Sequence, residues 1–364
     1  MVRGYRGLSQ EPLPKIEIST IAYLAERERG TFVEIFPKEP VRALPHPFQE
    51  QKDEIGFSKA AYIFDLNDID FWGRYGGSVV TSDNRLLADL SPEVWGTENH
   101  PVFSSFRLPK SRLLHGRTAI CVTPEAPGNY YHWLIDLLPR VALVKKAAGF
   151  QSVDQILLNG SGAFYEQTSL QALGVPLDNV LFVDRHDRFQ ISRATIPSMD
   201  HSSMIVAPWK IRALRETRDA ILGASLPTPK RLYISRARAA VRRVLNEAAL
   251  TSVLQNNGFA VVELESMPWT EQVRLFYNAE IIFAPHGAAL ANIAFCRPNT
   301  LIVEIGTRSG FKEFYWRLAS SAQLRYRFIK ARPAVAAQAD SQRAVENEDM
   351  IVDEEKLVDL LRDL

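Results

Sequence analysis

The sequence has few cysteines and no long apolar runs. Its two cysteines, Cys121 and Cys296, lie far apart among 364 residues and belong to no paired-ligand motif. We therefore expect reduced thiols and no structural zinc site. No stretch of about 18 apolar residues is present, and no leader with a basic and then an apolar part is found. These absences predict a cytoplasmic protein, with any membrane contact peripheral and at the inner face.

The chain also lacks an excess of charge of either sign. Lysine and arginine total 43 against 42 aspartate and glutamate residues, so the formal net charge is +1. This balance argues against a nucleic-acid-binding protein. A hydrophobic share of 46% and a charged share of 23% are ordinary for a soluble globular chain, and the length favours two domains. Composition leaves the oligomeric state open, with a homodimer as the default expectation.

An irregular, proline-rich start is followed by two series of alternating strands and helices. The start contains one clear hairpin pattern, at residues 76–87. The strands expected in the first series are 117–122, 156–158 and 180–183, with helices at 131–148 and 163–173. The strands expected in the second series are 231–235, 259–264, 281–284, 301–305 and 324–329. Such alternation is typical of parallel sheets and predicts an α/β protein.

These patterns predict four parts of the chain. They are a strand-rich N-terminal segment (1–115), an N-terminal Rossmann-like domain (116–226), a C-terminal Rossmann-like domain (227–332) and a tail with a closing amphipathic helix (333–364). The linker between the two α/β domains is expected at residues 223–229, which include two prolines. Ligands of such folds bind outside the carboxyl ends of the strands, so we expect a cleft between the domains.

One candidate site lies at the turn after the expected strand 281–284. Pro285, His286 and Gly287 follow this strand and precede a segment of small residues with helical character. Free N–H groups and the helix dipole at such a point favour an anion such as phosphate. His286 can donate to a phosphate oxygen, and Gly287 allows a close approach to the backbone. Glu304, at the end of the next strand, is expected near His286 to accept hydrogen bonds from ribose.

A second candidate is the arginine-rich loop after the strand 231–235. The strand ends at Ser235, and Arg236, Arg242 and Arg243 precede a helix that Asn246 is placed to cap. Arginine forks bind phosphate oxygens in bidentate fashion. A solvated basic loop is the competing interpretation, but the position at a strand's carboxyl end favours an anion site.

A third candidate is a helical stripe of acid, base and cation. His132, Asp136 and Arg140 recur every four residues and share one helix face. His132 can take a proton near neutral pH while Asp136 holds or tunes the imidazole. Spacing alone favours a solvated face carrying an ordinary i,i+4 pair. Pro139 should kink or end the helix within this pattern.

Several motifs, in order along the chain, together resemble glycosyltransferase family 61. They are Tyr131-His132-Trp133-x-x-Asp136-x-x-Pro139-Arg140, Tyr233-Ile234-Ser235-Arg236, Arg242-Arg243-x-x-Asn246-Glu247, Glu271-Gln272 and Pro285-His286-Gly287-Ala288-Ala289-Leu290-x-Asn292. The resemblance covers about residues 115–310. It implies a GT-B fold of two Rossmann-like domains, with the C-terminal domain holding a nucleotide-sugar donor. It also implies inversion at the anomeric carbon without an obligatory metal or other cofactor.

The resemblance implies a transferase that acts in capsular or cell-surface polysaccharide synthesis. A UDP-sugar is the first donor to consider, and the acceptor would be an oligosaccharide or glycolipid hydroxyl. The expected catalytic residues are His132, Asp136 and Arg140, with the choice of base between the first two left open. The expected donor-binding residues are Ser235, Arg236, Arg242, Arg243, Asn246, Glu247, His286, Gly287, Ala288, Asn292 and Glu304.

Two other functions, and one possible metal-binding motif, are compared with the transferase interpretation. A catalytically silent nucleotide- or glycan-binding component of a polysaccharide assembly system would keep the donor site but need no base. An α/β oxidoreductase would carry Gly-x-Gly-x-x-Gly after a strand, and neither the loop at 235 nor that at 286 has it. Asp68-Ile69-Asp70 spells a metal-binding pattern, but so short a motif arises readily by chance, and we expect no metal there.

Overall fold

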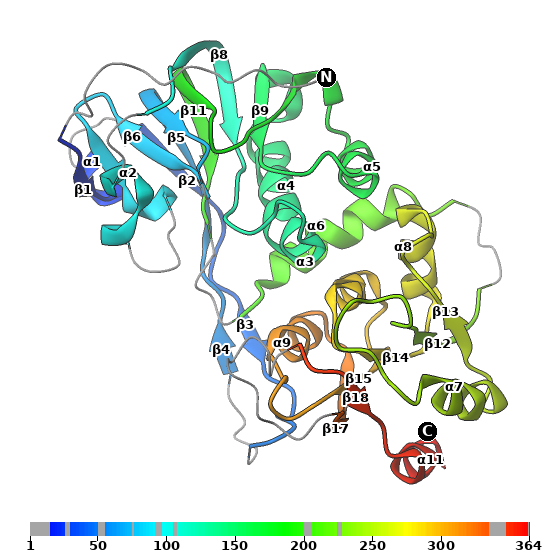
Figure 1. Ribbon diagram of the computed structural model, residues 1–364. Helices are drawn as coiled ribbons and strands as arrows, with labels where there is room; N and C mark the ends of the chain where they lie inside the picture. The colour runs from blue at the N-terminus through cyan, green and yellow to red at the C-terminus, as the bar shows by residue number, and fades with distance from the viewer. Residues whose placement is uncertain are drawn as a thin grey trace. The chain divides into compact units, whose positions relative to one another are not determined.

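The computed structural model (Figure 1) describes ten stretches of the chain, namely residues 15–25, 30–49, 55–74, 76–91, 97–104, 108–199, 205–223, 228–334, 347–362 and 364. The chain divides into two units. The first comprises Met1–Glu39 and Lys59–Ser203, and the second comprises Pro40–Ser58 and Met204–Leu364. Both contain parallel strands with helical connections, which confirms the predicted mixed α/β class.

The described strands of the first unit form one nine-stranded sheet. They are β1 (Glu17–Ser19), β2 (Gly30–Phe36), β5 (Ala61–Trp72), β6 (Ser78–Thr81), β7 (Arg85–Leu87), β8 (Arg112–Ile120), β9 (Gln155–Leu158), β10 (Val180–Phe182) and β11 (Arg188–Pro197). The order is β1-β7-β6-β5-β11-β8-β9-β10, and β2 also pairs with β5. β8, β9, β10 and β11 are parallel to their neighbours among themselves, as the first strand–helix series predicted. The 76–87 hairpin is confirmed as β6 and β7.

Helices connect these parallel strands. α3 (Tyr130–His132), the π-helix η3 (Trp133–Leu137) and α4 (Leu138–Ala147) form one continuous helical stretch between β8 and β9. α5 (Phe164–Leu173) leads to β10 and ends at Gly174, whose left-handed φ of 86° is favourable for glycine. The remaining helical segments of this unit are α1 (Ile21–Ala25), η1 (Ala88–Leu90), η2 (Thr97–Asn99), α2 (Pro101–Ser104), η4 (Phe150–Ser152) and η5 (Leu177–Asn179).

The longest strands of this sheet, β5 and β11, were not predicted from the sequence. They pair antiparallel, and β11 also pairs in parallel with β8. Strands from both sides of residue 115 therefore share one sheet and one core, in which Phe71 of β5 packs with Phe189 of β11. The pairing joins residues more than a hundred positions apart, and no local pattern in the sequence reports such a contact.

The second unit contains a five-stranded sheet that is parallel throughout. Its strands are β12 (Arg231–Ile234), β13 (Ala260–Val262), β14 (Ile281–Pro285), β15 (Leu301–Gly306) and β16 (Arg325–Lys330), in the order β13-β12-β14-β15-β16. β15 is buried along its whole length, which explains why its residues other than Glu304 are apolar or glycine. All five strands of the second predicted series are thus confirmed. The chain reverses its direction of growth between β12 and β14, and this is the switch point of a doubly wound sheet.

Helices and short strands complete the second unit. The helices are α6 (Pro208–Asp219), α7 (Glu247–Asn256), α8 (Trp269–Asn278), the 3-10 helix η6 (Ala288–Phe295), α9 (Phe314–Ser321) and α11 (Glu354–Arg362). The short strands are β3 (Pro40–Arg42), β4 (Ile55–Phe57), β17 (Arg332–Pro333) and β18 (Met350–Ile351).

Two parts of this unit bear on the predicted domain limits. α6 lies within the second unit, before the linker expected at residues 223–229, of which 224–227 are outside the described residues. The closing helix is confirmed as α11, whose Leu357 is fully buried. None of the helices in the described ranges combines the length and apolar character that a membrane span requires.

Candidate active site

The switch point of the second sheet brings the two predicted anion-binding loops together. β12 ends at Ile234 and β14 ends at Pro285, and the two strands are hydrogen-bonded parallel neighbours. Their following loops therefore leave the same edge of the sheet, where ligands of doubly wound folds bind. A Cβ atom added to Gly287 would lie 2.1 Å from Nη1 of Arg236. The backbone after β14 thus packs directly against the guanidinium of the loop after β12.

This contact explains why position 287 is occupied by glycine. The φ angle of Gly287 is 173°, an extended conformation that any residue adopts. Space, and not backbone conformation, is the limit here: a side chain would displace the guanidinium of Arg236. The sequence predicts that Gly287 allows a ligand to approach the backbone closely, and the structure shows that its first close neighbour is the side chain of Arg236.

Arg236 and Arg242 are neighbouring cations without an ion-pair partner among the described residues, although the charges of Glu265 and Glu247 also act on Arg236. Neither side chain forms an ion pair in the described ranges, and the buried Nε atom of each has no hydrogen-bond partner there. Arg236 donates from Nη2 to the carbonyl of Val241 at 3.1 Å. Burial, and next the charge of Arg242, lower the pKa of Arg236, although a guanidinium remains protonated in proteins. Two neighbouring cations with free N–H groups form a site that an anion would stabilise.

The other arginines of this loop are compensated. Arg238 pairs with Glu263 at 2.9 Å, and its side chain is 69% exposed. Arg243 pairs with Asp349 at 2.6 Å, and this bond raises the pKa of Arg243 and lowers that of Asp349. The guanidinium of Arg243 is therefore committed to Asp349 and not to the edge of the sheet. Sequence alone gave no reason to separate these arginines from Arg236.

His286 is held by a buried carboxylate. Its Nδ1 lies 2.5 Å from Oε1 of Glu304, and Oε2 of Glu304 accepts a hydrogen bond from the hydroxyl of Tyr326 at 2.6 Å. Glu304 is fully buried, and both of its oxygens are engaged. This carboxylate orients His286, and the expected contact of Glu304 with ribose stays a prediction. Burial, and next the charge of Glu304, raise the pKa of Tyr326, which keeps the phenol protonated as a donor.

Two further predicted donor-binding residues, Ser235 and Glu247, support the loop after β12. Oε1 of Glu247 accepts from the hydroxyl of Tyr233 at 2.8 Å and from the backbone N–H of Arg236 at 3.1 Å. Oγ of Ser235 accepts from the N–H of Ala237 at 3.1 Å. These bonds fix the start of the loop that carries Arg236.

The three remaining predicted donor-binding residues, Asn246, Ala288 and Asn292, differ in their contacts. Asn246 does not cap α7 with its side chain, because that side chain is bonded to the backbone of Val352. Asn292 is fully buried and donates to Oε1 of Gln272 at 3.1 Å. Ala288 is exposed and begins η6.

The predicted base and its carboxylate meet in the first unit. Nδ1 of His132 lies 2.7 Å from Oδ2 of Asp136, and Nε2 lies 2.5 Å from Oε2 of Glu125. The three side chains are 16%, 22% and 49% exposed, in the order His132, Asp136, Glu125. Sequence reasoning missed Glu125. The available signal was an acidic residue in the Pro124–Gly128 loop, at the carboxyl end of β8.

The helix around this pair contains a π-turn. The N–H of Leu138 bonds to the carbonyl of Trp133, five residues earlier, and Pro139 follows at the start of α4. Pro139 was expected to kink or end the helix, but the helix continues to Ala147. Proline lacks an N–H group, and the wider π-turn accommodates it without ending the hydrogen-bonded stretch. π-turns of this kind are frequent at functional sites, and this one includes Asp136.

Arg140, the third residue of the predicted stripe, is buried and is not exposed beside His132 and Asp136. It is 3% exposed and donates to the carbonyls of Val122 and Pro197, the latter at 2.7 Å. Burial lowers its pKa to about 10. The side chain therefore joins the end of β11 to the segment after β8. It was predicted as a catalytic residue, and its burial gives it a structural position.

The second acidic residue of the Asp68-Ile69-Asp70 pattern is engaged by an arginine. Asp70 accepts hydrogen bonds from Nε of Arg188 at 2.9 and 3.0 Å and pairs with its Nη2. Across the described ranges, no three histidine, cysteine or acidic side chains converge in a way that would hold a metal ion.

Comparison with known families identifies the segment that carries both groups. The model of the family described as Glycosyltransferase 61 matches residues 130–303. Residues 130–303 form a glycosyltransferase family 61 domain. His132, Asp136, Arg236, Arg242 and His286 all lie within this span, and the resemblance inferred from the motifs is confirmed.

No curated protein matches the sequence. One solved structure, a dodecameric iron-containing heptosyltransferase TibC in complex with ADP-D-beta-D-heptose, aligns over 80% of this chain and 77% of its own. The two share 10% sequence identity with a TM-score of 0.28.

Proposed function

We propose that this family 61 glycosyltransferase moves a sugar from a nucleoside diphosphate sugar to a hydroxyl of a glycan, with inversion and without a metal ion. The observation that carries the proposal is the pair Arg236 and Arg242 at the switch point of the second sheet, whose Nε atoms lack hydrogen-bond partners among the described residues. Such a pair can bind a diphosphate and stabilise its developing charge as it leaves. Preorganised positive groups of this kind are worth several kcal/mol in a transition state.

In this proposal each loop of the second sheet contacts the donor differently. Arg236 and Arg242 bind the diphosphate oxygens. His286, held at Nδ1 by Glu304, directs Nε2 toward the ligand and donates when the ring is protonated. The start of η6 at Ala288 adds backbone N–H groups. We take a UDP-sugar as the first donor to test.

His132 is the proposed base, and Asp136 its orienting partner. While both neighbouring carboxylates are ionised, the imidazole must donate from both nitrogens and cannot accept a proton. Glu125 is half-exposed, and an acceptor hydroxyl can displace it from Nε2. Asp136 then holds Nδ1–H, and Nε2 accepts the proton of the hydroxyl, as in other oriented histidine bases.

The proposed displacement balances in one step. The acceptor oxygen forms a bond to the anomeric carbon as that carbon's bond to the diphosphate oxygen breaks, and the acceptor proton passes to Nε2 of His132. The nucleoside diphosphate leaves with the electron pair. In this proposal the second unit binds the donor, and the motif resemblance implied a GT-B fold for such an enzyme. A cytoplasmic enzyme of capsular or cell-surface polysaccharide synthesis, acting on an oligosaccharide or glycolipid, fits these substrates.

The test is a transfer and binding assay on the full chain. Thermal shift against UDP, GDP, CMP, dTDP and their sugars, with and without EDTA, identifies the donor class, since a ligand at a hundredfold excess over its dissociation constant adds about 2.7 kcal/mol of stability. Radiolabelled transfer from that donor to oligosaccharide acceptors then measures activity in His132→Ala and Asp136→Asn. Loss of transfer with retained donor binding in both variants supports the proposal, and loss in Asp136→Asn alone makes Asp136 the base.

A catalytically silent binding component is the competing function. Arg236 and Arg242 support a nucleotide-binding protein as much as they support a transferase. A binding protein would not need a base, so the His132–Asp136 pair favours the transferase. If the double variant His132→Ala/Asp136→Asn leaves the biological function of the protein unchanged, the transferase proposal fails. If no nucleotide shifts the melting temperature, the proposed donor site is refuted, and with it the support that both functions draw from that site.

A further inference from the structure

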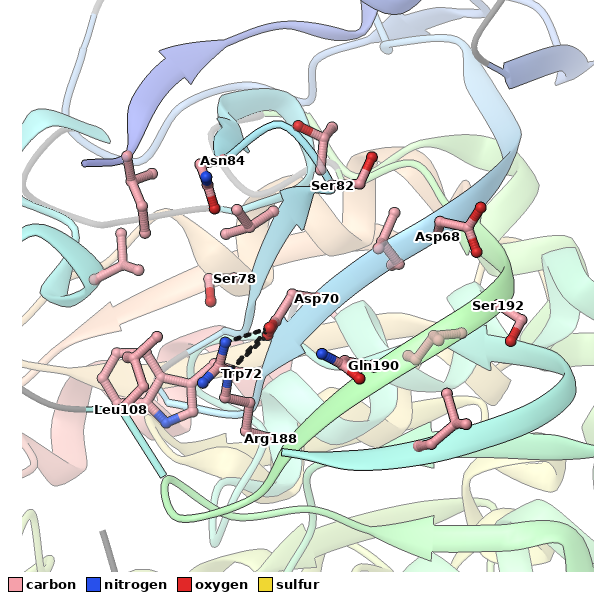
Figure 2. Close-up of a pocket in the computed structure, with 17 residues that line it drawn as sticks. Asp68, Asp70, Trp72, Ser78, Ser82, Asn84, Leu108, Arg188, Gln190 and Ser192 are labelled. Atoms are coloured by element: carbon pink, nitrogen blue, oxygen red, sulfur yellow. Dashed lines mark hydrogen bonds and ion pairs between the residues drawn. The ribbon is translucent and has the colours of Figure 1, made fainter. Parts of the chain in front are cut away.

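The first unit contains a cavity of 390 Å³ that the candidate active site does not use (Figure 2). It lies on one face of the sheet, over β5, β6 and β11. Trp72 pairs with Arg188 in register, and Asp70 pairs with Gln190, so alternate residues of both strands line the cavity. The cavity is at the lower end of the range for small-molecule sites, roughly 300–1,000 Å³.

The cavity wall combines hydrogen-bonding groups with a net negative charge. Arg188 and Asp70 neutralise each other through their ion pair, shown by the dashed lines in Figure 2. Asp68 adds one negative charge, and within the described ranges no hydrogen bond or ion pair engages its carboxylate. The exposed amide of Gln190 offers a donor and an acceptor. Trp72, which donates its indole N–H to the carbonyl of Arg185 at 2.9 Å, supplies apolar surface.

Ser78 provides the observation that points to a ligand. It is 1% exposed, yet its Oγ has no hydrogen-bond partner among the described residues. A buried hydroxyl without a partner is costly and uncommon in folded proteins. Ser78 lines the cavity, and Figure 2 shows it on the same side as Asp70, Arg188 and Trp72. Rotation of the Ser78 side chain toward the cavity would let a ligand hydroxyl satisfy this group.

We propose that this cavity binds one neutral sugar residue of a glycan. Vicinal hydroxyls donate and accept at once, which suits the mixture of serine, amide and carboxylate groups in the wall. The net negative charge disfavours phosphate and uronate ligands by like-charge repulsion. A metal ion is disfavoured because the carboxylate of Asp70 is already bonded to Arg188. The lining of this cavity shares no residue with the two groups assigned to sugar transfer, so it would bind a part of the glycan other than the reacting hydroxyl.

The test measures sugar binding by the full chain without measuring transfer. Saturation-transfer NMR and titration would use glucose, galactose, mannose, N-acetylglucosamine and glucuronate as probes. Ser78→Ala breaks no hydrogen bond of the free protein, so its melting temperature should be unchanged or higher while neutral-sugar affinity falls. Gln190→Ala alters an exposed residue and should act likewise. Each loss is expected to be roughly two- to tenfold, the worth of one hydrogen bond.

Matched variants separate this site from the others. Asn67→Ala changes an exposed residue of β5 that does not line the cavity, and Arg236→Ala disables the proposed donor site, so neither should alter neutral-sugar binding. Glucuronate should bind more weakly than glucose, and Asp68→Asn should narrow that difference. Asparagine tolerates the left-handed φ of 51° at this position.

Three outcomes would overturn the proposal. The first is that no neutral sugar binds the wild-type protein. The second is binding that Ser78→Ala and Gln190→Ala leave unchanged, or that Arg236→Ala abolishes. The third is Mn²⁺ binding that Asp68→Asn removes, since this would make the cavity a cation site. A negative nucleotide screen would refute the proposed donor site and leave this inference standing.

Discussion

Replacement of Arg236 by alanine tests the central contact of the proposed donor site. The side chain makes one native hydrogen bond, to the carbonyl of Val241, and its Nε has no partner among the described residues. Truncation also removes the repulsion from Arg242, which lowers the pKa of Arg236, together with the attraction to Glu265 and Glu247, which raises it. Because a single hydrogen bond disappears and these two charge effects oppose each other, we expect the free energy of unfolding to change by about 1 kcal/mol or less.

Nucleotide binding should change much more than stability. A charge-assisted hydrogen bond is worth about 1.5–3 kcal/mol, which corresponds to roughly a 10- to 150-fold weaker dissociation constant for the nucleoside diphosphate. Isothermal titration calorimetry of the wild type and of Arg236→Ala measures this ratio directly. Arg238→Ala is the matched control, because it removes an arginine of the same loop that is exposed and paired with Glu263. The affinity of Arg238→Ala for the nucleoside diphosphate should stay within about twofold of the wild-type value.

Comparing the nucleotide affinities of Arg236→Ala and Arg238→Ala tests whether the unpaired guanidinium of Arg236 binds the diphosphate directly. Equal effects of Arg236→Ala and Arg238→Ala would mean that the loop acts only through its net charge, and the argument from unpaired guanidinium groups would be refuted. A wild-type affinity retained in Arg236→Ala would place the diphosphate elsewhere. Repeating the titration at two salt concentrations separates direct contacts from long-range attraction, which salt screens.

Four other changes have expected outcomes. Gly287→Ala should displace the guanidinium of Arg236 and weaken nucleotide binding by about the same factor as Arg236→Ala, with secondary structure unchanged by circular dichroism; unchanged affinity would mean that the added methyl is accommodated. Arg140→Ala should lower the free energy of unfolding by about 3 kcal/mol or more in urea titrations, because buried carbonyls lose their donor; a small loss would contradict its structural position. Tyr326→Phe should cost about 1.5–3 kcal/mol through the lost bond to a buried carboxylate, measured in the same way. Burial raises the pKa of Cys121 from 9.0 to about 12, so the contribution of the protonated thiol to stability is present below pH 9 and is lost as the pH rises toward 12. The melting temperature should therefore fall between pH 9 and pH 12, and it should fall less in Cys121→Ala. Thiol reagents should leave the native protein unmodified.

The strands and loops of the second sheet could be predicted because their signals are local. β14 and β15 are short apolar runs bounded by turn residues, and β12 is followed at once by its arginines. In a parallel sheet, carboxyl ends share one edge, so the sequence already placed His286 near Arg236. The pair His132 and Asp136 was likewise visible as a spacing of four residues within one helical stretch.

Only the tertiary structure decided which side chains in these loops are available to a ligand. The arginines of one loop differ through carboxylates distant in the sequence: Arg243 is paired with Asp349, while Arg236 packs against Gly287. Glu304 and Arg140 have the chemistry of site residues, yet both are buried and bonded within the protein. The pairing of β5 with β11, and with it the cavity around Ser78, joins segments far apart in the chain. Local sequence determined the elements and their order, because propensity and periodicity act over a few residues. The compensation of each charge depends on long-range contacts, and these exist only in the folded chain.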